Sequence, residues 1–233
     1  MAAILLVACL ATWLTFSRLQ DLQHADTLIL AIVSLQRWTP FLWESDRFGM
    51  LVPLIAKPVH DPFSNLLLQT AVDVAAALLA PFLLARFLMR DSRWFSTGAT
   101  ANLLLLVTAT AAARFDWLVA QPYAMSTSLG LASLLMLETD GRPRLFAAAV
   151  LMLLGHWVNV GIGIMLVPLV LLGGGRSRWR AALLIGASTL SVSLFARALP
   201  LPRTTTAVIS ISAWPHAWSL LLQTAAAATV PSR

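Results

Sequence analysis

The chain has little charge, a single lysine and a single cysteine. Charged residues make up 11% of its 233 residues, hydrophobic residues make up 59%, and the mean hydropathy is +0.80. Soluble domains carry about 25% charged residues, so this composition excludes an ordinary soluble protein and indicates a polytopic membrane protein. A disulfide framework is excluded as well, because Cys9 has no second cysteine to pair with.

The net charge of +6 comes almost entirely from arginine, since Lys57 is the only lysine. Strongly basic chains often bind nucleic acid. Here the arginines lie in short loops between apolar runs, where the positive-inside rule of membrane proteins accounts for them. No nucleic-acid partner is therefore predicted, and the expected partner is membrane lipid.

Apolar runs predict an all-α fold, a transmembrane helical bundle with about seven crossings. A bilayer core about 30 Å thick needs about 20 helical residues. Five runs are predicted to cross once each: residues 1–17, 63–88, 94–113, 117–137 and 181–196. Residues 145–172 supply the other two crossings, and the whole chain, 1–233, is predicted to form one transmembrane domain.

The distribution of arginine predicts on which side of the membrane each loop lies. Eight arginines fall within 23 positions of three loops: residues 86–93, 138–144 and 173–180. The other polar segments hold seven lysines or arginines in 69 positions, with six of the ten acidic residues: residues 18–61, 114–117 and 197–217. The first three loops are therefore predicted to be cytoplasmic, together with the N-terminus. Residues 18–61 then form an exterior first loop.

Residues 145–172 are predicted to form a hairpin of two short helices. One helix of 28 residues would be about 42 Å long, and it would place two arginine-rich loops on opposite sides. A break near residues 155–159 avoids that conflict. Such a break requires protein or a watery cavity to satisfy the backbone.

Within the first loop, Asp26 is a candidate catalytic residue. It directly precedes residues 27–35, an apolar stretch too short to cross and therefore expected at the interface, as are residues 50–56. A carboxylate beside apolar surface suits the role of general base. The alternative is an N-cap of a short helix that begins at Thr27.

The segment WESDRFGML, residues 43–51, carries three further charged candidates: Glu44, Asp46 and Arg47. Arginine binds phosphate through its planar guanidinium, and carboxylates bind a substrate hydroxyl or a divalent metal. The alternative is a local ion pair in a solvated loop. No metal-ligand spacing is present, so no cofactor is predicted.

Polar residues at two other exterior positions are further candidates: Asp116 for catalysis and the others for substrate binding. Asp116, Gln121 and Tyr123 lie at the outer end of the fourth crossing, where interfacial anchoring is the alternative for Tyr123. His156 and Asn159 lie at the hairpin tip, and a structural hydrogen bond is the alternative for the histidine.

Asp73 lies inside the second crossing, where an ionisable side chain is costly. Such a residue is expected to serve a function or to have a buried partner. Arg86 is too far along the same helix to pair with it, so a partner must come from elsewhere. Asp73 is therefore a candidate for lining a polar cavity within the helical bundle.

This layout resembles the N-terminal half of GT-C glycosyltransferases, which include protein mannosyltransferases and aminoarabinose transferases. The resemblance covers about residues 1–200. It consists of a short first helix, an exterior loop opening with Asp26, the patch WESDRFGMLVPLIAKP, a second acidic turn over residues 114–123 and the broken hairpin GHWVNVGIGIMLVPLVLL.

The resemblance implies transfer of a sugar from a polyprenyl-phosphate donor at the outer membrane face. Asp26 would be the base, Asp116 a second acidic residue, and Arg47 or His156 would meet the donor phosphate. The chain departs from the family in having one acid at position 26 where many relatives have a pair. It also lacks the further helices and soluble C-terminal domain usual there, so an incomplete or degenerate member is expected.

Two other classes remain open. One is a non-catalytic membrane scaffold or partner subunit. The other is a transporter or permease subunit in which Asp73 and the broken hairpin form a midplane site, although no internal repeat relates the two halves. In each case the expected location is a bacterial inner or plasma membrane, and no oligomeric state is predicted.

Overall fold

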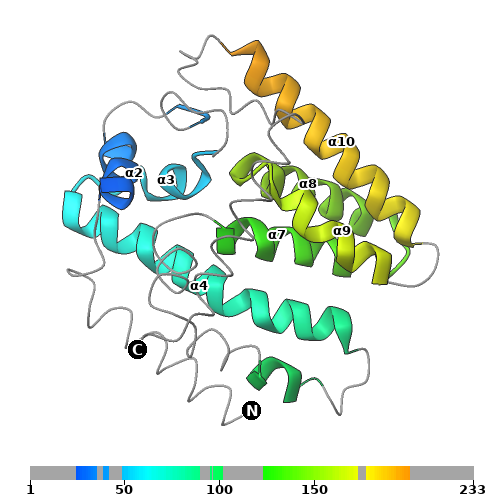
Figure 1. Ribbon diagram of the computed structural model, residues 1–233. Helices are drawn as coiled ribbons and strands as arrows, with labels where there is room; N and C mark the ends of the chain where they lie inside the picture. Colours follow the sequence, from blue (N-terminus) through cyan, green and yellow to red (C-terminus); the bar gives the residue numbers. More distant parts are fainter. Residues whose placement is uncertain are drawn as a thin grey trace, which may run out of the picture. The chain divides into compact units, whose positions relative to one another are not determined.

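The computed structural model describes residues 25–35, 39–41, 49–89, 95, 97–101, 123–172 and 177–199. The chain divides into two compact units, Met1–Pro202 and Arg203–Arg233, and all described residues belong to the first. Helices are the regular elements of the described part, with one isolated bridge between Phe41 and Gly49 (Figure 1). The predicted all-α class is confirmed for these residues, and the single domain stays a prediction.

Two short helices occupy the first loop. They are α2 (Ala25–Leu35) and α3 (Leu51–Ala56), close to the two interfacial stretches predicted from the sequence. Because α2 begins at Ala25, Asp26 is its second residue, and the alternative of an N-cap before Thr27 is wrong. Both helices pack against α4.

The long helix α4 (Pro62–Leu88) confirms the predicted run over residues 63–88. It begins where Asp61 accepts a hydrogen bond from the Ser64 N–H at 2.8 Å. Proline follows at the first helical position, where its missing N–H needs no partner. A capped start and a proline therefore fix where this helix leaves the first loop.

Four more helices follow: α7 (Tyr123–Met136), α8 (Arg142–Val158), α9 (Ile162–Leu172) and α10 (Ser177–Ala198). Gly130 of α7 lies beside Gly155 of α8 and beside Ile162 and Leu166 of α9. Both helices of the hairpin therefore pack on α7, and α10 packs on both.

Two described helices are long and apolar enough to cross a membrane, α4 and residues Arg178–Ala198 of α10. This supports membrane association. Helices α7 and α9 are apolar but shorter. Seven crossings stay a prediction, because residues 1–17 and most of 94–113 lie outside the described residues.

The arginine-rich loops meet at one end of these helices. Arg180 Nη1 lies 2.7 Å from Asp140 Oδ1, which joins loop 173–180 to loop 138–144. Phe87, near the end of α4, packs against the core cluster that contains Leu137. We call this the arginine end: the end of α4, the turn between α7 and α8, and the start of α10. The ion pair shows that two of the three arginine-rich segments are adjacent, and the side of the membrane on which they lie stays a prediction.

Candidate functional site

The break between α8 and α9 is held by Asn159. Its N–H donates to the Gly155 carbonyl at 3.0 Å, its Oδ1 accepts from the Gly161 N–H at 2.9 Å, and its carbonyl accepts from the Ile162 N–H at 3.1 Å. Asparagine suits a reversal because its side chain bonds backbone two residues further on. The predicted hairpin break is confirmed, and it begins at the last residue of the predicted range.

The first loop docks on this break. Gly49 N–H donates to the Val158 carbonyl at 3.2 Å, and Trp157 Nε1–H donates to the Pro40 carbonyl at 2.8 Å. Met50 N–H also donates to Pro40, at 3.1 Å, which holds the two sides of the loop together. A Cβ on Gly49 would overlap the Trp157 carbonyl, so only glycine permits this approach.

Phe41 anchors the same contact from the other side. Its ring is fully buried, packs with Val192 and Ala196 of α10, and lies 5.8 Å from the Phe195 ring between centroids. We call Pro40, Phe41, Gly49, Trp157 and Val158 together the loop junction. It fastens the first loop to both the hairpin tip and the end of α10.

Three predicted site residues belong to the segment that the loop junction brackets. Glu44, Asp46 and Arg47 lie outside the described residues. The flanking residues Phe41 and Gly49 form an antiparallel bridge, and Gly49 bonds Val158 at the α8–α9 break. Their role as a site stays a prediction.

The remaining exterior candidates are less fully described. Asp26 is placed in the first turn of α2, and the structure describes its backbone only. Asp116 and Gln121 lie outside the described residues. Tyr123 is the first residue of α7, is half-buried, and its carbonyl accepts from the Ser126 hydroxyl at 2.9 Å. None of these predicted roles is tested by the geometry.

His156 lies one residue before Trp157 but faces the helices. It is 0% exposed, and its Nδ1 lies 2.9 Å from the Met152 carbonyl. A carbonyl only accepts, so Nδ1 carries the proton and Nε2 is left as an acceptor. That Nε2 lies against Gly163 of α9, near Thr189 of α10, and has no hydrogen-bond partner in the structure. For His156 to contact the phosphate of a polyprenyl-phosphate sugar, as predicted, the helices would have to move apart.

Asp73 is buried in α4, with 5% of its surface exposed. Its Oδ1 has no hydrogen-bond partner, and the same is true of Thr127 Oγ1 in α7. One turn along α4, the Ser128 hydroxyl of α7 donates to the Ala76 carbonyl at 2.7 Å. The helices thus approach closely beside a carboxyl oxygen that is left without a donor.

A buried polar network missed by the sequence analysis joins α2, α3 and α4. Asn65 Nδ2 lies 3.0 Å from Ser34 Oγ and 2.9 Å from the carbonyls of Ala56 and Val59. Gln69 Nε2 donates to Asn65 Oδ1 at 2.7 Å. The Asn65 amide thus supplies hydrogen bonds to carbonyls at and just after the end of α3, where a helix has no further N–H groups of its own.

One signal in the sequence could have revealed this network. Asn65, Gln69 and Asp73 are spaced four residues apart in an otherwise apolar helix, so they share one face. Two of the three are hydrogen-bonded to the first-loop helices or to each other. The third carries the unpaired carboxyl oxygen.

Among the described residues outside the helices, Asp61 has a carboxyl group whose pKa is shifted. Hydrogen bonds from the Ser64 hydroxyl and N–H hold the pKa of its carboxyl below the usual range. Among the described residues no three His, Cys, Asp or Glu side chains gather as a metal site would require. The structure therefore offers no ligand set from which to argue a metal.

Comparison with known protein families, with curated proteins and with solved structures finds no match to this chain. Functional inference accordingly rests on the residues of the chain itself.

Proposed function

We propose that this chain is a membrane glycosyltransferase-like protein that transfers a sugar from a polyprenyl-phosphate donor at the outer membrane face. The observation that supports it best is the loop junction. Through Trp157 and Gly49, the loop that carries Glu44, Asp46 and Arg47 is fastened beside the α8–α9 break. The described residues on both sides of these charged groups thus lie at the edge of the helical bundle, where a reaction between a lipid-linked donor and a water-borne acceptor needs charged groups.

The proposed topology places the loop junction outside. The arginine end is cytoplasmic in this proposal, because arginine accumulates in cytoplasmic loops. The chain crosses about seven times, with α8 and α9 as the broken hairpin. The ion pair between Arg180 and Asp140 supports it, since it joins two loops that the charge rule assigns to the same side.

The proposed chemistry needs a base and a cation. Asp26 takes the proton of the acceptor hydroxyl as that oxygen bonds to the anomeric carbon. The bond from this carbon to the phosphate oxygen breaks, and the polyprenyl phosphate leaves with the electron pair. Arg47 stabilises its charge through a forked guanidinium contact. Asp116 is the second acidic candidate, and Gln121, Tyr123 and Asn159 are candidates for the sugar hydroxyls.

The test is the Asp26→Asn variant in membranes supplied with a labelled polyprenyl-phosphate sugar and candidate acceptors. Loss of a general base is expected to lower the transfer rate about 10²- to 10⁴-fold. The matched control is Asp61→Asn, which makes the same exchange in the same loop. Asp61 is an exposed cap of α4, and asparagine caps equally well, so activity should be retained. A wild-type rate in Asp26→Asn would contradict the assignment.

A transporter subunit is a second candidate, and Asp73 supports it. A buried carboxyl whose Oδ1 has no hydrogen-bond partner is the kind of group that binds protons or cations in transporters. In proteoliposomes, Asp73→Asn should then abolish proton-coupled uptake while Asp26→Asn leaves it intact. If instead Asp26→Asn abolishes sugar transfer while Asp73→Asn leaves it intact, the result favours the glycosyltransferase.

A further inference from the structure

We propose that the arginine end binds the phosphate headgroup of an anionic phospholipid from the cytoplasmic leaflet. A cleft of about 230 Å³ lies between the end of α7, the following turn, and the first turns of α8 and α10. Its wall includes Arg142 of α8 and Arg180 of α10. Pockets that enclose drug-sized ligands measure about 300–1,000 Å³, so this cleft suits a headgroup and not a whole lipid.

The charge at this end favours an anion. Four arginines lie on the first turns of two helices: Arg142, Arg144, Arg178 and Arg180. Both helices also begin here, and helix N-termini carry partial positive charge. Of the described residues at this end, the acidic ones are Glu138 and Asp140. Positive charge therefore exceeds negative charge around the cleft.

Asp140 forms an ion pair with Arg180, one of the two arginines of the cleft. Its Oδ1 accepts from Arg180 Nη1 at 2.7 Å, but its side chain is 90% exposed. Exposed ion pairs contribute little to stability, so a phosphodiester can displace this carboxylate. Guanidinium groups bind two phosphate oxygens at once. Asp140 thus acts as a competitor for the ligand.

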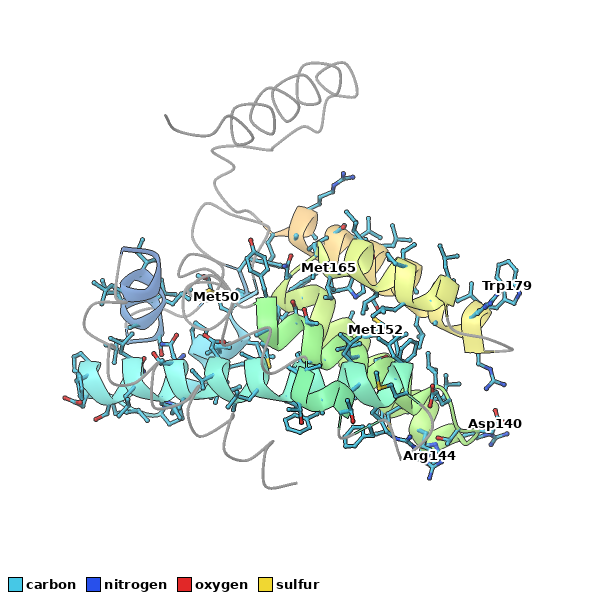
Figure 2. All side chains as sticks on the ribbon, turned by 60° about the horizontal axis from the view of Figure 1, so that its bottom comes forward. Met50, Asp140, Arg144, Met152, Met165 and Trp179 are labelled. Carbon is cyan, nitrogen blue, oxygen red and sulfur yellow. The ribbon has the colours of Figure 1, made fainter. Side chains whose placement is uncertain are left out.

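The apolar surface distinguishes a lipid from free phosphate. Leu145 forms part of the cleft wall, and Trp179, between Arg178 and Arg180, is 78% exposed. Beyond the arginines, Phe146 of α8 and Leu183 of α10 are each 72% exposed. Figure 2 shows Asp140, Arg144 and Trp179 at the same end of the helices. Arginine followed by exposed apolar side chains along both α8 and α10 matches the order of phosphate and acyl chain in a phospholipid.

The experiment measures lipid retention by the purified full chain in a neutral detergent, by native mass spectrometry. Phosphatidylglycerol should be retained at least about fivefold more tightly than phosphatidylcholine. Arg142→Gln or Arg180→Gln should each weaken phosphatidylglycerol binding about fivefold, and the double variant about 25-fold. Arg197→Gln removes the same charge from the last turn of α10 and should leave binding unchanged.

Asp140→Asn separates the lipid site from a merely structural ion pair. Removing the competitor should tighten phosphatidylglycerol binding about two- to fivefold, opposite in sign to Arg180→Gln. Weaker binding in both variants would overturn the proposal, because it would mean that the pair only holds the loops. So would equal retention of the two lipids, or an equal loss in Arg197→Gln. Competition by sn-glycerol 3-phosphate at the lipid's own concentration would assign the cleft to a soluble phosphate and overturn the lipid source.

Discussion

The two ends of the helices hold their loops by different means. At the arginine end, Asp140 and Arg180 meet through exposed charged groups. At the loop junction, Phe41 is fully buried and the contacts with Trp157 and Val158 are hydrogen bonds to backbone. Charge is long-ranged, tolerant of geometry and screened by water, whereas buried rings and backbone contacts require one arrangement. The contact at the arginine end is therefore weak and adaptable, whereas the loop junction holds the first loop in one arrangement.

The largest expected difference between the ends comes from Phe41→Ala. Removing a fully buried phenylalanine leaves a cavity beside Val192 and Ala196, and such changes destabilise by about 3–5 kcal/mol. The control is Phe146→Ala at the arginine end, where an exposed ring predicts a change within about 0.5 kcal/mol. Thermal unfolding in detergent measures both. Equal losses would mean that the two ends are held alike.

The next effect is expected from Gly49→Ala. The added Cβ collides with the Trp157 carbonyl, so the loop must move, at a cost of about 1–3 kcal/mol. Gly186→Ala in α10 is the matched control, because nothing lies within 4 Å of its added Cβ. Within a helix that exchange should stabilise by about 0.5–1 kcal/mol. Shifts of the same sign in the two variants would contradict the close approach at Gly49.

A smaller, pH-dependent effect is expected from Asp61→Ala at the start of α4. The folded-state pKa of Asp61 is lowered, first by the Ser64 hydroxyl and then by its N–H. Its contribution to stability is therefore present above the unfolded-state pKa and is lost as the pH falls through the folded-state pKa. The difference in melting temperature between wild type and variant should be clear at pH 7 and should shrink below about pH 4. A difference that does not change with pH would rule out this charge effect.

The smallest effect on stability is expected from Asp140→Asn. Exposed ion pairs contribute about 0.2–1 kcal/mol, and the exposure of this carboxylate favours the lower part of that range. The melting temperature of the Asp140→Asn variant should rise or fall by no more than a degree or two when salt is added. A loss as large as that of Phe41→Ala would show that the arginine end determines the fold after all.

Local sequence was sufficient to predict the helices. The apolar run over residues 63–88 predicted the helix that the structure shows as α4. The arginine-rich segments on both sides of residues 145–172 predicted the break that separates α8 from α9. Both predictions depend on how a segment partitions between water and an apolar phase. That preference is a property of the segment itself, so no knowledge of its neighbours is needed.

The candidate site was predictable only in part. The sequence assigned the first loop and the hairpin tip to the same exterior side, and the structure shows that they touch, since the hydrogen bond from Trp157 to Pro40 joins residues 117 positions apart in those two regions. It did not reveal that His156 faces Gly163, or that Asn65 binds a carbonyl of α3 and is itself bound by Gln69. Side-chain direction at a break depends on where the next helix lies, which local periodicity does not encode.

The sequence by itself predicted that the described part of the chain is helical and apolar enough for a membrane, and that residues 145–172 break into two helices, because composition and charge act through the solvent. The tertiary structure decided that Gly49 and Phe41 fasten the first loop, that Asn65 is satisfied while Asp73 Oδ1 is not, and that Arg142 and Arg180 line one cleft. These depend on shape and on the positions of several helices at once, which only packing fixes.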